Sequence, residues 1–193
     1  MKKAACCLMV GLCAAAAAAQ QPAAPATQQT PPPASLDIAG SLKIQHANIR
    51  RNLSASAEKM PDADFHFKPQ GVVPEMRTFG QIIAHLANAN NTTCARLKGA
   101  TAPSRLDDKL TQTKAELVKA LSDALTLCDS VYDAATSTTI NEMIKVPGPN
   151  DTQVERARGN ALISNIAHNN EHYGNLVTYF RAKGLVPPSS EGR

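Results

Sequence analysis

Four stretches of the chain carry apolar residues at roughly every third or fourth position, and proline- or glycine-containing segments separate them. This period places apolar side chains on one face of an α-helix. The stretches lie at residues 35–59, 79–98, 107–134 and 152–183. No segment alternates apolar and polar residues convincingly enough to indicate a strand. The pattern therefore predicts an all-α fold, built as a four-helix bundle.

Local signals define the ends of these predicted helices. Pro61 ends the first helix, because proline interrupts helical hydrogen bonding. Thr78 is suited to cap the start of the second helix, and Gly99 is suited to end it. Gly184 is the expected C-cap of the fourth helix. The Thr-rich stretch at residues 136–151 is long enough to cross one end of the bundle as a loop.

Composition excludes several classes of function. The 193 residues suffice for one ordinary domain. Aromatic residues make up 4% and tryptophan is absent, so the core must be largely aliphatic and a base-stacking platform is not expected. The formal net charge is +4, and removal of Lys2 and Lys3 with a leader would leave +2. A charge this small and scattered argues against a nucleic-acid partner.

Residues 1–19 have the features of a signal peptide. Lys2 and Lys3 form a short basic segment, an uncharged apolar run follows, and small residues precede the expected cleavage site before Gln20. An N-terminal membrane anchor is the alternative, but the apolar run is short for a span. We therefore expect a bacterial protein that is periplasmic or secreted.

Residues 20–34 consist only of Gln, Pro, Ala and Thr and carry no charge. Repeated proline blocks both helix and strand, which predicts a disordered tether between the signal peptide and the fold. The fold itself is expected over residues 35–190. No second apolar run of about 18 residues occurs, so we expect no membrane span after signal removal.

Cysteine usage agrees with export. Cys6, Cys7 and Cys13 lie in the signal peptide, which leaves Cys94 and Cys128 in the mature chain. An even count in an oxidising compartment favours one disulfide, here between two predicted helices. Two buried free thiols are the alternative, since cysteine packs well as a small apolar residue. Neither cysteine belongs to a C-x-x-C motif, so a dithiol redox function is not expected.

Three of the five histidines indicate a metal site. His168 and His172 are four residues apart, which stacks two imidazoles on one face of the fourth helix. His85 lies roughly 120° to one side of the apolar face of its helix, and the pair is displaced to the same side. The spacing alone is also compatible with solvent-facing or hydrogen-bonded imidazoles. We expect His46 and His66 to be structural or exposed.

Longer motifs around these histidines resemble the DinB/YfiT-like family of metalloenzymes. That family has a histidine in an (I/L)-x-H-L context on the second helix, and H-x-x-x-H followed by an aromatic residue and glycine on the fourth. The resemblance covers about residues 35–190, including the first loop. The matching stretches are TFGQIIAHLA at residues 78–87, EHYGNLVTYFR at residues 171–181 and KGLVPPSS at residues 183–190.

This resemblance implies a DinB-like four-helix bundle that binds one divalent metal ion. In the family the ion varies among zinc, nickel, iron and manganese. Carried over residue by residue, the ligands are His85, His168 and His172. Three neutral imidazoles leave an open coordination position, as in catalytic rather than closed structural sites. Some relatives act as thiol-dependent transferases or isomerases.

Polar residues near the predicted ligands are candidates for supporting roles. Asn88, Asn165 and Asn175 each lie about one turn from a predicted ligand. Each is a candidate to orient an imidazole or to bind substrate, with an ordinary surface position as the alternative. Tyr179 and Arg181 are candidates to line the mouth of the site.

Two hypotheses of different class follow for the function. The first is an exported metal-dependent hydrolase or thiol transferase that acts on an unknown small-molecule substrate. The second is a non-catalytic helical module that binds a metal or a partner. A pocket beside the three histidines would favour the enzyme, and a fourth protein ligand would favour the module. The sequence leaves open whether the domain forms a homodimer.

Overall fold

In a computed structural model of the chain, the described residues are 36–71, 73–107 and 111–191. The predicted signal peptide and tether, at residues 1–19 and 20–34, lie outside them. The described residues form four long α-helices joined by loops, short 3₁₀ turns and one β-hairpin. The predicted helical bundle is confirmed.

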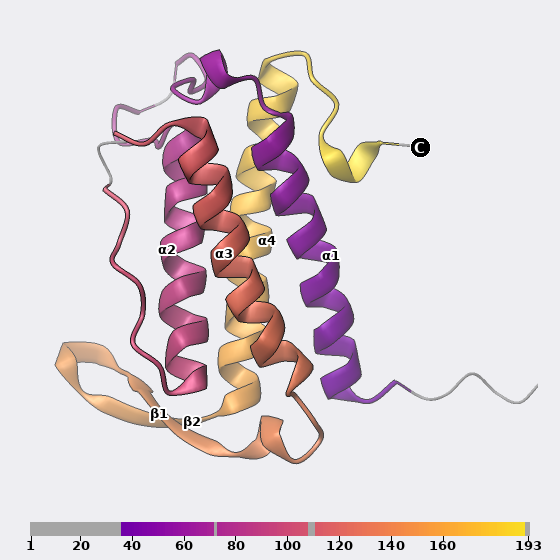
Figure 1. Ribbon diagram of the computed structural model, residues 1–193, viewed down its shortest axis with the longest axis vertical. Coiled ribbons are helices and arrows are strands. Elements are labelled where there is room, and N and C mark those ends of the chain that lie inside the picture. Colours follow the sequence, from indigo (N-terminus) through magenta and orange to yellow (C-terminus); the bar gives the residue numbers. More distant parts are fainter. Residues whose placement is uncertain (1–35, 72, 108–110, 192–193) are drawn as a thin grey trace, which may run out of the picture. The chain divides into compact units, whose positions relative to one another are not determined.

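The helices are α1 (Ile38–Lys59), α2 (Phe79–Lys98), α3 (Lys114–Asp133) and α4 (Arg158–Ala182). In Figure 1, α1 and α4 run in one direction, and α2 and α3 run in the other. The main packing pairs are α2 with α3 and α4, and α1 with α3 and α4. Each helix therefore has two principal neighbours, and all four enclose a common interior.

The start of α2 is fixed by a capping box. The Thr78 hydroxyl accepts a hydrogen bond from the Gln81 backbone N–H at 3.3 Å, and Gln81 Oε1 accepts one from the Thr78 N–H at 2.7 Å. Gly99 ends the helix with φ of 68°, a left-handed conformation that glycine adopts without strain. Both predicted ends of this helix are confirmed, and His85 is held near its start.

The predicted start of the third helix near residue 107 is wrong. The helix begins at Lys114, after Thr113. A second capping box causes this, because Glu116 Oε2 accepts from the Thr113 N–H at 2.7 Å and the Thr113 hydroxyl accepts from the Glu116 N–H at 3.3 Å. Two satisfied backbone donors make this the preferred start.

The buried face of α1 differs in part from the predicted one. Leu42, Ile49 and Leu53 are buried as expected. The helix begins only after Asp37, whose carboxylate accepts a hydrogen bond from the Gly40 N–H at 2.7 Å. Three residues that the pattern assigned to the apolar face are exposed, namely Leu36, Ile38 and Ile44.

The prediction of no strand is also wrong, since a short antiparallel hairpin precedes α4. Strand β1 (Met143–Pro147) pairs with β2 (Gln153–Ala157), with Val146 opposite Val154 in the register. The fourth helix therefore begins at Arg158 and not near residue 152. The Arg158 backbone N–H donates to the Glu142 carbonyl at 2.8 Å, which joins the hairpin to the first turn of α4.

The aliphatic core divides into two clusters. One contains Leu53, Ile83, Leu121 and Leu176, together with every Phe and Tyr ring except that of Tyr132. The other cluster lies toward the hairpin and includes Leu162. The aromatic rings of the first cluster make edge-to-face contacts, and the ring centroids of Phe79 and Phe180 lie 5.8 Å apart. The rings of the first cluster gather where the first loop, which carries Phe65 and Phe67, packs on the bundle.

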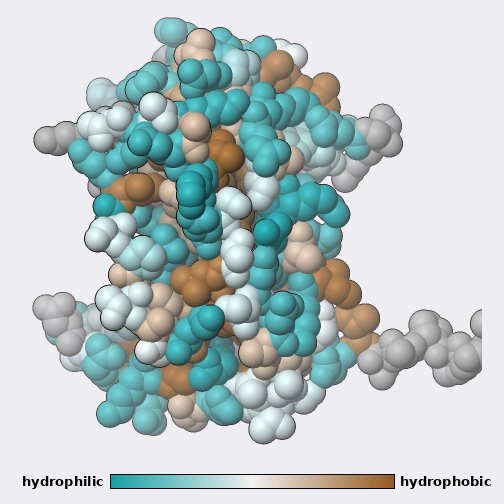
Figure 2. Space-filling model, in the orientation of Figure 1, coloured by the Kyte–Doolittle hydropathy of each residue, from teal (hydrophilic) through white to brown (hydrophobic). Residues whose placement is uncertain are grey.

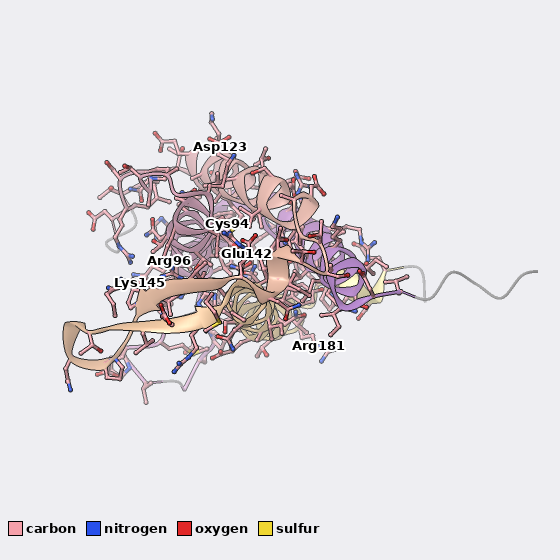
Figure 3. The ribbon with its side chains drawn as sticks, turned by 90° about the horizontal axis from the view of Figure 1, so that it is seen from below. Cys94, Arg96, Asp123, Glu142, Lys145 and Arg181 are labelled. Carbon is pink, nitrogen blue, oxygen red and sulfur yellow. A yellow bond between two sulfur atoms is a disulfide. The ribbon has the colours of Figure 1, made fainter. Side chains whose placement is uncertain are left out.

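A disulfide links α2 to α3 within the second cluster. Cys94 and Cys128 form the bond, and both residues are fully buried. Figure 3, a view from the hairpin end, labels Cys94. The predicted pairing is confirmed, and the alternative of two free thiols is wrong.

The face of the molecule seen in Figure 2 is mainly hydrophilic. Figure 2 shows hydrophilic residues over most of one face, with small separated groups of hydrophobic residues between them. Within the described ranges, no helix combines the length and apolarity needed to cross a bilayer.

His46 is part of the core and not of the surface. Its ring stacks on Tyr132 with centroids 4.0 Å apart, and Nε2–H donates to Asp129 Oδ1 at 2.9 Å. The second ring nitrogen, Nδ1, is buried without a hydrogen-bond partner. Burial lowers the pKa of His46 despite the Asp129 carboxylate, because a second ring proton would find no acceptor. The structural role predicted for His46 is confirmed.

Removing the disulfide should destabilise the fold without unfolding it. A Cys94→Ala/Cys128→Ala variant releases a cross-link that spans 34 residues. The expected loss in the free energy of unfolding is about 2–4 kcal/mol, measured by urea denaturation. Dithiothreitol should lower the midpoint of the native chain and leave that of the variant unchanged. Equal sensitivity of both proteins to the reductant would contradict this assignment.

Acidification should destabilise the fold partly through His46. The folded state holds the pKa of His46 below 6.5, so below that pH the unfolded chain binds a proton that the folded chain does not. The stability due to neutral His46 is complete above about pH 6.5 and declines as pH falls toward the folded pKa. In His46→Gln, the free energy of unfolding should therefore fall less steeply between pH 7 and pH 5. Parallel pH profiles for the two proteins would refute this.

Candidate metal centre

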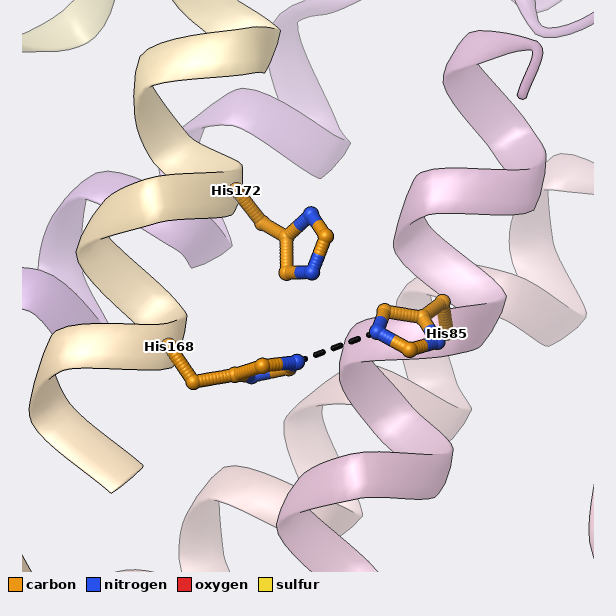
Figure 4. Close-up of side chains that lie close together, drawn as sticks. All are labelled: His85, His168 and His172. Atoms are coloured by element: carbon orange, nitrogen blue, oxygen red, sulfur yellow. Dashed lines mark hydrogen bonds between the residues drawn. The ribbon is translucent and has the colours of Figure 1, made fainter. Parts of the chain in front are cut away.

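Three histidines from two helices converge on the flank of the bundle. His85 projects from α2, and His168 and His172 project from successive turns of α4, as Figure 4 shows. All three side chains are half-buried. The helical spacing of four residues stacks the α4 pair, and the contact of α2 with α4 brings His85 opposite. The structure brings the three histidine side chains together, as the sequence predicts.

The ring nitrogens lie close enough to share one ion. One nitrogen from each ring can be chosen so that all three lie within 4.8 Å of one another. Nε2 of His85 and Nε2 of His168 are 3.0 Å apart and hydrogen-bonded. His172 lies with its ring centroid 4.6 Å from that of His85 and 4.5 Å from that of His168. Within the described part of the chain, no other His, Cys, Asp or Glu belongs to this cluster.

The surroundings favour uncharged imidazoles. Burial, followed by the charge of Arg77, lowers the pKa of His85 to about 4. Burial is also the first cause of the lowered pKa of His168 and of His172, which the nearby carboxylate of Glu171 opposes. A neutral imidazole keeps the lone pair that a metal ligand needs. The donor set therefore fits a divalent transition metal, which imidazole nitrogens bind well.

A network of buried amides joins the two helices beneath the histidines. Asn90 on α2 and Asn169 on α4 are fully buried, and each amide nitrogen donates to the other's oxygen, at 2.9 and 3.0 Å. Asn165 donates to the same Asn90 oxygen at 3.0 Å, and its own oxygen accepts from the Tyr132 hydroxyl at 3.0 Å. Asn169 directly follows His168, so the network fixes the helix register at the site.

The three asparagines singled out by the sequence have different roles. Asn175 lies near a predicted ligand, with its amide nitrogen 3.4 Å from Nδ1 of His172. Asn88 instead binds the loop after α2, accepting from the Leu106 N–H at 2.8 Å and donating to the Leu106 carbonyl at 3.2 Å. Asn165 belongs to the buried network. Asn90 and Asn169 are not predicted by the sequence, in which their only signal is their place on the buried faces of their helices.

Tyr179 does not line the mouth of the site, contrary to expectation. It is fully buried, and its hydroxyl donates to the backbone carbonyl of Arg77. This bond anchors the segment just before α2, and with it an arginine whose charge lowers the pKa of all three histidines. Arg181 is exposed on the last turn of α4 and does not line the cavity beside His168.

A cavity of about 410 Å³ lies beside the cluster and includes His168 in its lining. Its walls come from α2, from the connection that follows it, from β1 and from α4. The lining includes the side chains of Thr92, Arg96, Arg105 and Ser164. A volume in this range is typical of sites for small molecules. The histidine cluster therefore adjoins space in which a ligand can lie.

Comparison with known proteins places these features in a family. The sequence profile of the DinB superfamily matches residues 45–176, which include all three histidines. No curated protein matches the chain. One solved structure with a similar fold is described as a conserved protein of locus from Enterococcus faecalis. The two are 14% identical with a TM-score of 0.55, and the match covers 77% of this chain and 98% of the other. At this identity the likeness concerns the fold alone.

The stability losses caused by replacing Asn90 and Asn169 singly should add up to more than the loss caused by replacing both together. Asn169→Leu removes one hydrogen bond from each polar atom of the Asn90 amide, which keeps the Leu86 carbonyl at 2.8 Å and the Asn165 amide at 3.0 Å as partners. Asn90→Leu should cost more, because Asn165 and Asn169 both lose their common acceptor, and an unsatisfied buried polar group costs about 1–3 kcal/mol. The Asn90→Leu/Asn169→Leu double variant should lose less stability than the sum of the single losses, as measured by urea denaturation. Additive losses would show that the two amides do not act as a pair.

Proposed function

The chain belongs to the DinB superfamily, and from this premise we propose that it is an exported metal-dependent enzyme, a hydrolase or thiol transferase that acts on a small molecule. His85, His168 and His172 are the proposed ligands of one divalent ion, which is zinc, nickel, iron or manganese. The observation that carries the proposal is the convergence of three imidazoles within 4.8 Å beside an accessible cavity.

Two features support an enzyme over a non-catalytic module. The cluster contains three candidate ligands and no fourth His, Cys, Asp or Glu among the described residues, which is the donor count of catalytic sites that keep one position for water or substrate. The cavity reaches His168, so a ligand in it can approach the site. When bound, the ion supplies Lewis acidity, which polarises a carbonyl or lowers the pKa of a water or thiol.

The chain's own residues hold and shape this site. The Asn90–Asn169 pair fixes α2 against α4, and therefore His85 against His168. Asn175 lies beside Nδ1 of His172 and restrains that ring, as the partners of metal-bound imidazoles commonly do. The bond from Tyr179 to the Arg77 carbonyl secures the chain at the entrance to α2. These contacts leave little freedom for the three rings to move apart.

Export is part of the proposal. The sequence of residues 1–19 supports a signal peptide, and the Cys94–Cys128 disulfide is typical of proteins in oxidising compartments. A periplasmic or secreted enzyme would then meet its substrate outside the cytoplasm. Localisation of a tagged full-length chain by cell fractionation tests this directly, with retention in the cytoplasm as the contrary result.

Loss of one histidine should abolish metal binding while the fold survives. His168→Ala removes the ligand that links the cluster to the cavity, so the purified protein should lose its stoichiometric metal with its helical content unchanged. Elemental analysis of protein prepared without a histidine tag, together with circular dichroism, measures both quantities.

A matched control separates this loss from a general effect of removing histidine. His66 is exposed in the first loop, outside the cluster, so His66→Ala should retain the full metal content. Full metal occupancy in His168→Ala, or equal losses in both variants, would refute the proposed ligand set. Retained metal with no turnover of thiol or ester substrates would favour the non-catalytic module instead.

A further inference from the structure

The described residues that line the cavity beside His168 are cationic or neutral. Arg96 from α2 and Arg105 from the connection after it are both among them, and none of these described residues is an aspartate or glutamate. Figure 3 labels Arg96 at the hairpin end of the bundle, and Val146 of β1 lines the same cavity. One cavity therefore contains a proposed metal ligand and two guanidinium groups.

Within the part of the chain that the structure describes, neither guanidinium group belongs to a salt bridge. The ion pairs of the described residues join other side chains, and both arginines are exposed. Nearby salt bridges, such as Arg158 with Glu142, use different cations. An arginine without a carboxylate partner keeps five donors in a planar fork, a geometry that matches paired oxygens of an oxyanion.

Neutral donors add to this lining. The hydroxyls of Thr93 and Ser164 and the amide of Asn160 border the same cavity. The hydroxyl of Thr92 donates to the Asn88 carbonyl at 2.8 Å and so serves α2 itself. The lining thus offers hydrogen-bond donors from both α2 and α4.

The charge around the histidines favours the same kind of ligand. Neutral imidazoles do not offset the charge of a divalent ion. An anionic ligand lying between the ion and the arginines would interact favourably with each of them.

We propose that this cavity binds a small molecule through an oxyanion group, a carboxylate or a phosphate, held by Arg96 and Arg105, with the reacting end of that molecule at His168. The inference deepens the proposed function and rests on it for the reaction. The binding of the anion rests on the arginines alone, so the two can fail separately.

Titration of the full chain with simple anions tests the proposal. The probes are glutarate, its neutral analogue glutaramide, and inorganic phosphate, added to metal-free and metal-loaded protein. Calorimetry gives the affinities, and NMR shifts of the backbone amides of Thr93 and Ser164 locate the binding. We expect saturable binding of glutarate or phosphate but not of glutaramide, and the tighter anion identifies the group.

Charge-matched variants make the result specific. Arg96→Gln/Arg105→Gln should weaken binding of the anion by about 10-fold or more, since charge-assisted hydrogen bonds are lost. Arg156→Gln removes the same charge from exposed β2, outside the cavity lining, and should leave the affinity unchanged. Arg96→Lys/Arg105→Lys, which keeps the charge but not the fork, should fall between them.

Three results would overturn the proposal. They are no saturable binding of either anion, equal binding of glutaramide, and equal weakening in Arg156→Gln and in the cavity variant. Metal content is measured in the same samples. Glutarate binding in protein that takes up no metal would uphold the anion site and reject the proposed metal function, whereas metal uptake without anion binding would do the reverse.

Discussion

The buried amide pair between Asn90 and Asn169 is the interaction on which the site depends. Aliphatic contacts between two helices tolerate small shifts, because hydrophobic packing is not directional. Two reciprocal hydrogen bonds between fully buried amides tolerate less, because they are directional and a shift of one helix along the other would lengthen both. His168 immediately precedes Asn169, and His85 lies on the same helix as Asn90. The contact that aligns α2 with α4 therefore also sets the separation of their imidazoles.

The helix α2 is held to both of its neighbours by specific links. The disulfide joins it to α3, and the amide network joins it to α4. These two links meet in space, because the Cys128 sulfur lies 3.5 Å from the Asn90 side-chain oxygen. In a core with few aromatic rings, such links supply directional restraint that aliphatic packing lacks. The disulfide and the amide network thus restrain α2 close to the histidine cluster.

The sequence predicts the helices and the histidine cluster of this chain better than it predicts the hairpin and the buried polar contacts. The four helices and the grouping of His85, His168 and His172 follow from apolar periodicity and from motifs. The hairpin was missed because Ile144 and Val146 alternate over only five residues, too few for a clear signal. Asn90 and Asn169 were missed because polar residues on a buried face satisfy one another only across the interface, which periodicity cannot show.

The place of Arg96 and Arg105 in the cavity could be found only in the structure. Arg96 lies in the last turn of α2 and Arg105 in the connection beyond it, so nothing in their spacing relates them to His168 on α4. The bundle brings them into one cavity because β1 closes that end and Asn88 binds the returning chain at Leu106. In the proposed site, three imidazoles would hold the ion, and the two arginines would hold the charged group of the ligand.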